Sequence, residues 1–171
     1  MTTPLFQVAF KEVQSCDTLL DVGCGIRPFT KVKCKKHICV EPHHEYAEIL
    51  KNNGYEVIQK KAVEALDDIE TVDTILALDV IEHMERADGD AFIKKALKKA
   101  KKQVVVFTPL GFMPQEEEGE RDSWGLHGQE FQKHRSGWVP DDFHGWMCYL
   151  ERQFHVRNNT TYGAFIVVHT A

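Results

Sequence analysis

Leu19-Leu20-Asp21-Val22-Gly23-Cys24-Gly25 is the stretch that decides the fold. The short apolar run at residues 18–22 is typical of a strand buried in a parallel sheet, and the glycines that follow end it abruptly. Because glycine has no Cβ, the backbone can turn tightly there and bring its N–H groups against a polar or anionic ligand. The stretch therefore predicts an α/β sheet with a ligand site at the carboxyl end of its first strand.

Further strands and helices alternate along the rest of the chain. Strand-like runs follow at residues 37–40, 55–59, 74–78, 103–108, 153–157 and 164–169, and the last two form an antiparallel pair joined through Asn158-Asn159. Helical spacing of apolar residues appears at residues 42–53, at 87–102 and after Pro140, with the stripes Ile93-Leu97-Ala100 and Phe143-Trp146-Met147-Leu150 on the second and third of these. The pattern predicts a Rossmann-like, open, mainly parallel seven-stranded sheet with helices on both faces and an antiparallel strand near the C-terminus.

Length and charge set the class of protein. The 171 residues fit one domain spanning residues 1–171, and we expect a monomer or a small homo-oligomer. A formal net charge of -5 disfavours a nucleic-acid partner, which normally requires a clustered basic surface. No run approaches the roughly 20 apolar residues of a membrane span, and Lys11 and Glu12 interrupt the apolar start, so we expect a cytoplasmic protein that has no membrane partner.

The cysteines indicate neither a disulfide framework nor a metal site. There are five, Cys16, Cys24, Cys34, Cys39 and Cys148, and they show no CxxC pair and no paired Cys/His spacing. We therefore expect buried free thiols and no bound metal.

Glu41 ends the second strand, where its carboxylate can accept both hydroxyls of a ribose. A glycine turn alone is weak evidence for a nucleotide-type ligand, because many such turns bind nothing. The acid at the end of the neighbouring strand strengthens it, and so does Leu78-Asp79-Val80-Ile81-Glu82-His83-Met84 after the fourth strand.

Residues 19–25, 40–42 and 78–83 resemble, in order and interval, the strand-end motifs of class I S-adenosylmethionine-dependent methyltransferases. The resemblance implies that Gly23 and Gly25 approach the methionine part of the cofactor, that Asp21 contacts its amino group and that Glu41 holds its ribose. It also implies that the cofactor pocket is lined by Asp79 and Val80, with His83 close by.

Two positions depart from the family pattern. Arg27 stands where the turn usually has its third glycine; it either reaches the cofactor carboxylate or is a surface arginine. After the third strand the family often has an acid beside the adenine, whereas this chain has Lys60-Lys61-Ala62. We expect Ala62 to contribute its backbone N–H there instead.

Methyl transfer to a hydroxyl or ammonium also requires a base, and histidine has the most suitable unperturbed pKa near neutrality. His83, His127 and His134 are unranked candidates, each with a structural hydrogen-bonding role as the alternative. Residues 109–137 lack periodicity and resemble the loop after the fifth strand of some small bacterial-type methyltransferases, so we expect acceptor recognition there. Its candidate acceptor residues are Arg121, Trp124, Arg135 and Trp138, although tryptophans are more often buried in a core.

The sequence thus predicts S-adenosylmethionine-dependent methyl transfer to an oxygen or nitrogen of a small-molecule or sugar-linked acceptor. One alternative is a regulatory module or a non-methylating enzyme that uses the same pocket. Another is an NAD-dependent oxidoreductase, which shares the glycine turn and ribose acid but typically has the third glycine.

Overall fold

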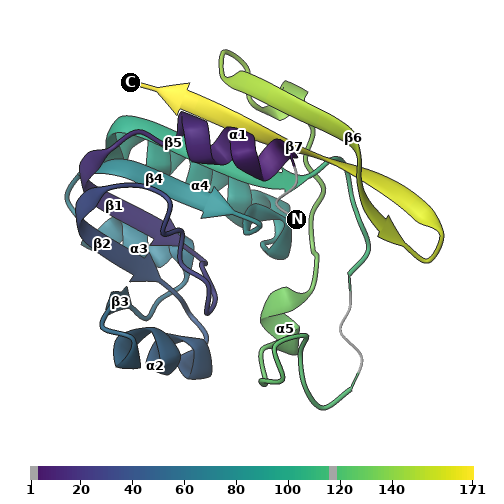
Figure 1. Cartoon of the computed structure of the whole chain (residues 1–171), viewed down its shortest axis with the longest axis horizontal. Helices are drawn as coiled ribbons and strands as arrows, with labels where there is room; N and C mark the ends of the chain where they lie inside the picture. Colours follow the sequence, from purple (N-terminus) through teal and green to yellow (C-terminus); the bar gives the residue numbers. More distant parts are fainter. Residues whose placement is uncertain (1–3, 116–118) are drawn as a thin grey trace.

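The computed structural model describes residues 4–115 and 119–171 of the chain, so the Glu116-Glu117-Glu118 part of the long loop lies outside the described residues. Over these residues one seven-stranded sheet has the strand order β3-β2-β1-β4-β5-β7-β6 (Figure 1). Its strands are β1 (Cys16–Val22), β2 (Cys34–Val40), β3 (Glu56–Ile58), β4 (Val72–Leu78), β5 (Ala100–Pro109), β6 (Met147–Arg157) and β7 (Thr160–Thr170). The first five pair in parallel, whereas β7 pairs antiparallel with both β5 and β6. The mainly parallel sheet with an antiparallel C-terminal strand is confirmed.

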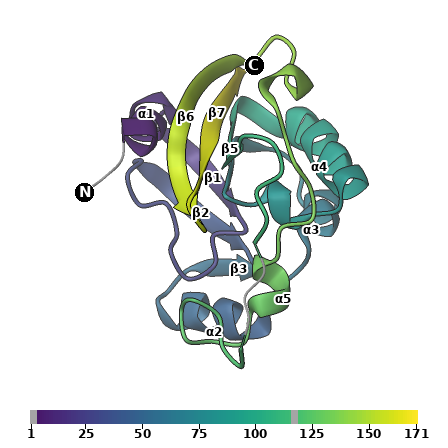
Figure 2. The same cartoon turned by 90° about the vertical axis from the view of Figure 1, so that its right-hand side faces the viewer.

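Helices cover both faces of the sheet, as predicted (Figures 1 and 2). Successive residues of a strand point to opposite faces, so neighbouring apolar residues belong to two cores. Leu19 packs in the core under α1 (Pro4–Glu12), and Leu20 in the core under α3 (Ala62–Asp68) and α4 (Arg86–Lys99). The helix α2 (His44–Asn52) packs beside β3 at the edge of the sheet. The continuous apolar runs of the central strands follow from this burial on both sides.

The structure corrects the helix that we expected at residues 87–102. It ends at Lys99, because Ala100 already pairs with Val72 and the hydrogen bonds of the β5 ladder replace those of the helix. Its buried face is Gly89-Phe92-Ala96, whereas the predicted stripe of Ile93, Leu97 and Ala100 lies one position out of phase, with Leu97 exposed.

The helix expected after Pro140 is wrong. A single 3-10 turn, η2 (Pro140–Asp142), and a turn at residues 143–146 lead into β6, the edge strand of the sheet. Asn158 and Asn159 adopt the positive φ values of a tight hairpin turn, +47° and +60°, so β6 completes a ladder with β7. Many side chains of this edge strand are exposed, among them Met147 and Val156. Its apolar residues therefore do not alternate with polar ones as they do in a half-buried strand.

All five cysteines are free thiols. Cys16 and Cys39 are buried as expected, but Cys24 and Cys34 are only partly buried and Cys148, on the edge strand β6, is exposed. None of the helices formed by the described residues is long and apolar enough to cross a membrane.

Candidate functional site

The turn after β1 takes a conformation that favours glycine. Gly23 and Gly25 have φ values of +62° and +57°, in the left-handed region. A Cβ on Gly23 would lie 2.8 Å from Cγ1 of Val80, and a Cβ on Gly25 would lie 2.3 Å from the ring of Trp124. The N–H of Gly23 donates to the carbonyl of Val40 at 2.7 Å, which fixes the turn against β2. Both glycines are therefore required by the backbone and by close neighbours.

Glu41 lies beside this turn at the end of β2, with only 3% of its surface exposed. Its Oε2 accepts the N–H of Gly25 at 3.0 Å, and its Oε1 accepts the N–H of His43 at 2.9 Å. Burial raises the pKa of Glu41 to about 7, even though these two hydrogen bonds act in the opposite direction. An ionised carboxylate has about four acceptor positions, so each oxygen can still accept a hydroxyl from a ligand.

Asp21 is buried under the turn and paired with His37 of the neighbouring strand β2. Its Oδ2 accepts the N–H of Phe29 at 2.7 Å and lies 3.1 Å from Nε2 of His37. Burial acts to lower the pKa of His37, but the hydrogen bonds to Asp21 and Cys39 outweigh it and raise this pKa to about 9. His37 is therefore protonated at neutral pH, and Asp21 retains Oδ1 as the oxygen through which it can meet a cation.

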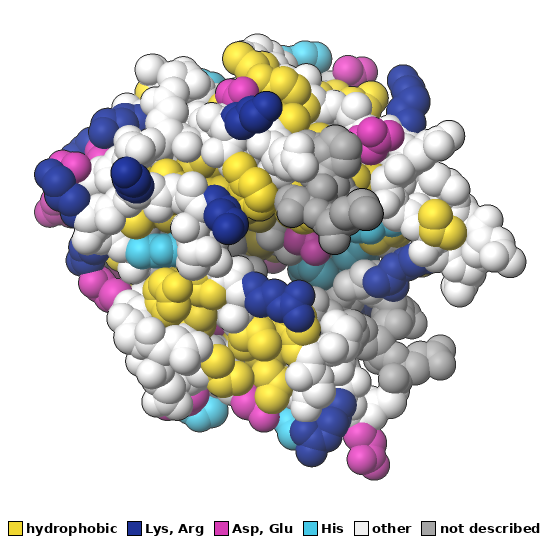
Figure 3. All heavy atoms as spheres, in the orientation of Figure 1, with side chains coloured by type: hydrophobic (Ala, Val, Ile, Leu, Met, Phe, Trp, Pro, Cys, Tyr) yellow, Lys and Arg dark blue, Asp and Glu magenta, His cyan; other side chains and the backbone are white. Residues whose placement is uncertain are grey.

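A cavity of about 1020 Å³ opens above the turn, at the carboxyl ends of β1, β2 and β4. Figure 3 shows this face of the molecule hollowed, with apolar side chains beside the opening. Its volume is at the upper end of the roughly 300–1,000 Å³ of small-molecule sites, which leaves room for two ligands side by side. Every residue predicted to bind the cofactor lines it: Asp21, Gly23, Gly25, Arg27, Glu41, Ala62, Asp79, Val80 and His83.

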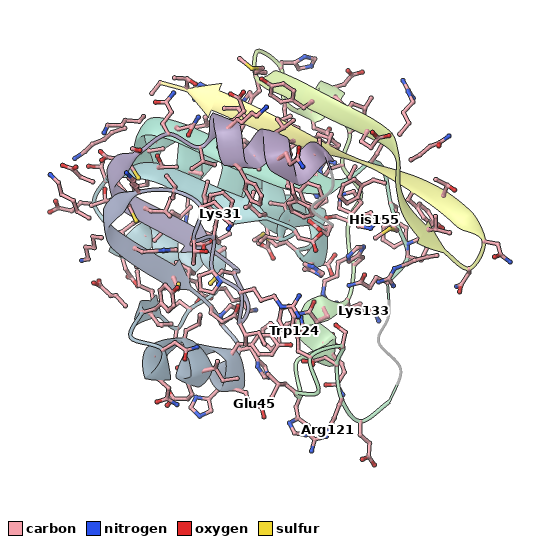
Figure 4. The ribbon with its side chains drawn as sticks, in the orientation of Figure 1. Lys31, Glu45, Arg121, Trp124, Lys133 and His155 are labelled. Carbon is pink, nitrogen blue, oxygen red and sulfur yellow. The ribbon has the colours of Figure 1, made fainter. Side chains whose placement is uncertain are left out.

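The loop after β5 forms the opposite wall of the cavity and is anchored to α2 by Asp122. This buried carboxylate accepts the N–H groups of Trp124 and Leu126, both at 2.9 Å, and the hydroxyl of Tyr46 on α2. Trp124 consequently points from the loop toward the glycine turn, with its ring 5.1 Å from that of Tyr46 (Figure 4). The guanidinium of Arg27 lies 5.9 Å from the same tryptophan ring.

No protein-family profile matches this sequence, and no curated protein matches it. Solved structures do match the fold. An S-adenosylmethionine-dependent methyltransferase from Archaeoglobus fulgidus has a TM-score of 0.66 at 12% identity, with 97% of this chain and 91% of that chain covered. The N-methyltransferase NodS from Bradyrhizobium japonicum WM9 gives 0.63 at 12% identity, with 97% and 91% covered. The magnesium protoporphyrin IX methyltransferase from Synechocystis PCC 6803, solved with bound S-adenosylmethionine, gives 0.56 at 11% identity, with 95% and 74% covered.

The chain has the class I S-adenosylmethionine-dependent methyltransferase fold. In this methyltransferase fold the cavity lies where ligands bind in open α/β sheets, at the carboxyl ends of the parallel strands.

Two of the predicted acceptor residues, together with His127, lie away from the cavity of the methyltransferase fold. Arg121 is exposed at the outer part of the loop, where it donates to the carbonyl of Gly125 (Figure 4). His127 is held on the surface by Glu45, to which its backbone N–H donates at 2.9 Å. Trp138 is only 1% exposed and is part of the core, which is the alternative that the sequence left open for the tryptophans. Trp124 and Arg135 do line the cavity.

The two remaining histidines lie together at the end of β4. His83, in the short helix η1 (Ile81–His83), lines the cavity. His134 is buried and does not line it, and its ring centroid is 4.8 Å from that of His83. Burial lowers the pKa of His83, and burial together with the neighbouring His83 lowers the pKa of His134 to about 4. Both imidazoles are therefore neutral at physiological pH and have a lone pair with which to accept a proton or bind a cation.

Sequence reasoning missed Tyr46, Asp122 and Glu82 as parts of this region. Tyr46 and Asp122 lie 76 positions apart, and only the folded loop brings them together. The signal that was available for Asp122 is its place before Ser123-Trp124-Gly125, because aspartate favours turns in which its carboxylate accepts nearby backbone N–H groups. Glu82 belongs to the quoted motif after the fourth strand, but nothing in the motif shows that its side chain is buried.

Proposed function

We propose that this protein transfers a methyl group from S-adenosylmethionine to an oxygen or nitrogen of a small-molecule or sugar-linked acceptor. The observation that carries the proposal is Glu41, a buried carboxylate beside the glycine turn whose two oxygens are each fixed by a backbone N–H. This arrangement presents two acceptors to a vicinal diol at the place where ribose-containing ligands bind in such sheets.

The residues present fit the cofactor. Gly23 and Gly25 keep the turn free of side chains, and any Cβ there would collide with Val80 or Trp124. Glu41 would hold the ribose, and Asp21 the ammonium group, through the oxygen that His37 leaves available. Three further lining residues would complete the site: Arg27 at the carboxylate, Ala62 at the adenine, and Asp79 beside the methionine part.

When bound, the cofactor supplies an electrophilic methyl group on a sulfonium. The chain contributes mainly position, because in-line displacement requires the acceptor atom to lie roughly 3 Å from the methyl carbon. His83 is neutral and faces the cavity, so it would accept the proton that a hydroxyl or ammonium acceptor loses. Trp124 and Arg135 would bind the acceptor from the loop at residues 109–137, with an aromatic wall and a cation.

Thermal unfolding with three ligands tests the proposal. We expect S-adenosylmethionine and its demethylated product to raise the unfolding temperature, since a ligand at about 100 times its Kd stabilises a fold by about 2.7 kcal/mol. NAD should cause no shift. No shift with the first two ligands contradicts the proposal, and a shift with NAD alone favours the oxidoreductase.

A second assay separates an enzyme from a regulatory module that uses the same pocket. Sugars, amines and phenols would be screened as acceptors by the appearance of demethylated cofactor. We expect one acceptor class to give product, and Trp124→Ala to raise KM for it more than it changes the Kd of the cofactor. Cofactor binding without product from any of the three classes favours the regulatory module.

A further inference from the structure

Three side chains of metal-binding type meet beside the cavity. Glu82, His83 and His134 each offer one potential ligand atom, and these atoms all lie within 4.8 Å of one another. The backbone holds the group together, because the carbonyl of Glu82 accepts the N–H groups of Arg135 at 2.7 Å and Ser136 at 3.1 Å. The cluster therefore joins two segments that are distant in sequence, which is why the spacing of histidines and cysteines gave no sign of it.

Both histidine rings are oriented by main-chain carbonyls. Nδ1 of His83 lies 3.2 Å from the carbonyl oxygen of Lys133, and Nδ1 of His134 lies 2.7 Å from that of Met113. A carbonyl oxygen only accepts, so Nδ1 carries the hydrogen in each neutral ring, and Nε2 has the lone pair. A hydrogen bond from one ring nitrogen to a carbonyl, with the other nitrogen left to bind the ion, is the arrangement found around histidine ligands of metals.

Glu82 is a carboxylate that lacks one partner. It is 1% exposed, and its Oε2 accepts the hydroxyl of Thr108 at 3.1 Å. Its Oε1 is fully buried and accepts no hydrogen bond from a donor among the described residues, and its side chain lies against the acidic side chain of Asp79. Leaving a buried carboxylate oxygen without a partner is costly, and a cation at this position would remove that cost.

We propose that Glu82, His83 and His134 bind one divalent transition-metal ion of the zinc or manganese type. Two imidazole nitrogens and one carboxylate suit these ions, whereas magnesium prefers oxygen ligands alone. Bonds of about 2.0–2.2 Å place neighbouring ligand atoms roughly 3.0–3.5 Å apart, so the side chains would draw together by about 1 Å on binding.

The site adjoins the cavity, because His83 and the nearby Asp79 line it. Three protein ligands leave coordination positions open, and an acceptor oxygen bound at one of them would lose its proton more readily. This catalytic role of the ion rests on the proposed function and implies that the methyl acceptor is an oxygen. His83 would then bind the ion and would not act as the base that takes the acceptor's proton. The metal site itself does not depend on methyl transfer.

Metal content measured without any cofactor tests the site. Protein freed of metal with EDTA would be dialysed against ZnCl2, MnCl2 or MgCl2, and the bound metal quantified by mass spectrometry. We expect one zinc or manganese ion per chain and much weaker magnesium binding. His134→Gln and Glu82→Gln should each weaken binding by roughly 100-fold, because changes to outer-shell residues alone cost roughly 10–100-fold.

His144→Gln is the matched control, because His144 is an exposed histidine on another part of the chain, and it should bind metal as the parent protein does. Circular dichroism of the metal-free variants shows which of them fold, and if Glu82→Gln does not, His134→Gln decides. Absence of stoichiometric zinc or manganese, or binding that survives in a folded His134→Gln variant, overturns the site. Thermal shifts with S-adenosylmethionine are recorded on the same samples, so failure of the metal site and failure of the methyltransferase proposal appear as separate results.

Discussion

Replacing Glu41 by glutamine should weaken cofactor binding and remove most of its dependence on pH. The pKa of Glu41 is raised to about 7 by burial, and only the ionised carboxylate can accept a hydrogen bond on all its positions. Roughly one tenth of the carboxylates are ionised at pH 6 and nine tenths at pH 8, so affinity should rise by about tenfold between these values. Above pH 8 the increase should level off.

The glutamine variant cannot reproduce this site. Both oxygens of Glu41 accept a backbone N–H, so an amide NH2 must face either Gly25 or His43 with a donor against a donor. Loss of a charged hydrogen bond costs about 1.5–3 kcal/mol, which weakens binding by roughly 10–100-fold at pH 8.

Calorimetric titration with S-adenosylhomocysteine at pH 6, 7 and 8 measures both effects. The amino and carboxyl groups of the ligand titrate alike with either protein, so the ratio of parent to variant affinity isolates Glu41. That ratio should grow by about tenfold from pH 6 to pH 8. A constant ratio across this range refutes the assignment of Glu41 as the ribose-binding carboxylate.

Three further predictions concern stability. Gly25→Ala should lower the free energy of unfolding by about 1–3 kcal/mol, and by less in a Trp124→Ala background, because the new Cβ would lie 2.3 Å from the tryptophan ring. Additive effects of the two substitutions in a double-mutant cycle, measured by urea unfolding, would show that residue 25 and Trp124 do not touch. Gly89→Ala should also destabilise the fold by about 1–3 kcal/mol, because its Cβ would meet the buried ring of Trp138 at 2.3 Å, although alanine usually strengthens a helix. A urea midpoint higher than that of the parent protein would contradict this packing. The raised pKa of His37 means that its ion pair with Asp21 stabilises the fold fully below about pH 6.5, and that this stabilisation is lost as the pH rises through about 9. The destabilisation caused by His37→Gln should therefore decrease by about 3 kcal/mol from pH 6 to pH 10, and a destabilisation that does not vary with pH would exclude the charged pair.

The central strands and the cofactor wall could be predicted from the sequence because their signals are local. An apolar run bounded by glycine or proline suffices to place β1 and β5, and Glu41 is placed by its position at the end of β2. The seven residues of the short helix α3 are too few to show a clear helical spacing of apolar residues, so the sequence does not predict this helix. The edge strand β6 is largely exposed, so Met147 and Leu150 in its first half fit a helical stripe, and only its second half, at residues 153–157, is predicted as a strand.

The contacts that hold the site in place could not be predicted, because they join residues that are distant in sequence. Asp122 meets Tyr46 only when the loop folds onto α2, and His37 meets Asp21 only across two paired strands. His134 reaches Glu82 and His83 in the same way, through backbone hydrogen bonds that link two loops. A tertiary contact of this kind leaves no periodic pattern in the sequence.

Calorimetric titration of the parent protein, Gly23→Val and Gly145→Ala with S-adenosylhomocysteine tests the central claim most directly. Gly145 has a positive φ of +82° like Gly23, but a Cβ there has nothing within 4 Å and it does not line the cavity, so it controls for backbone strain alone. We expect one ligand per chain in the parent protein and in Gly145→Ala, and no measurable binding in a folded Gly23→Val variant. A parent protein that does not bind, or a Gly23→Val variant that binds equally well, would contradict the account.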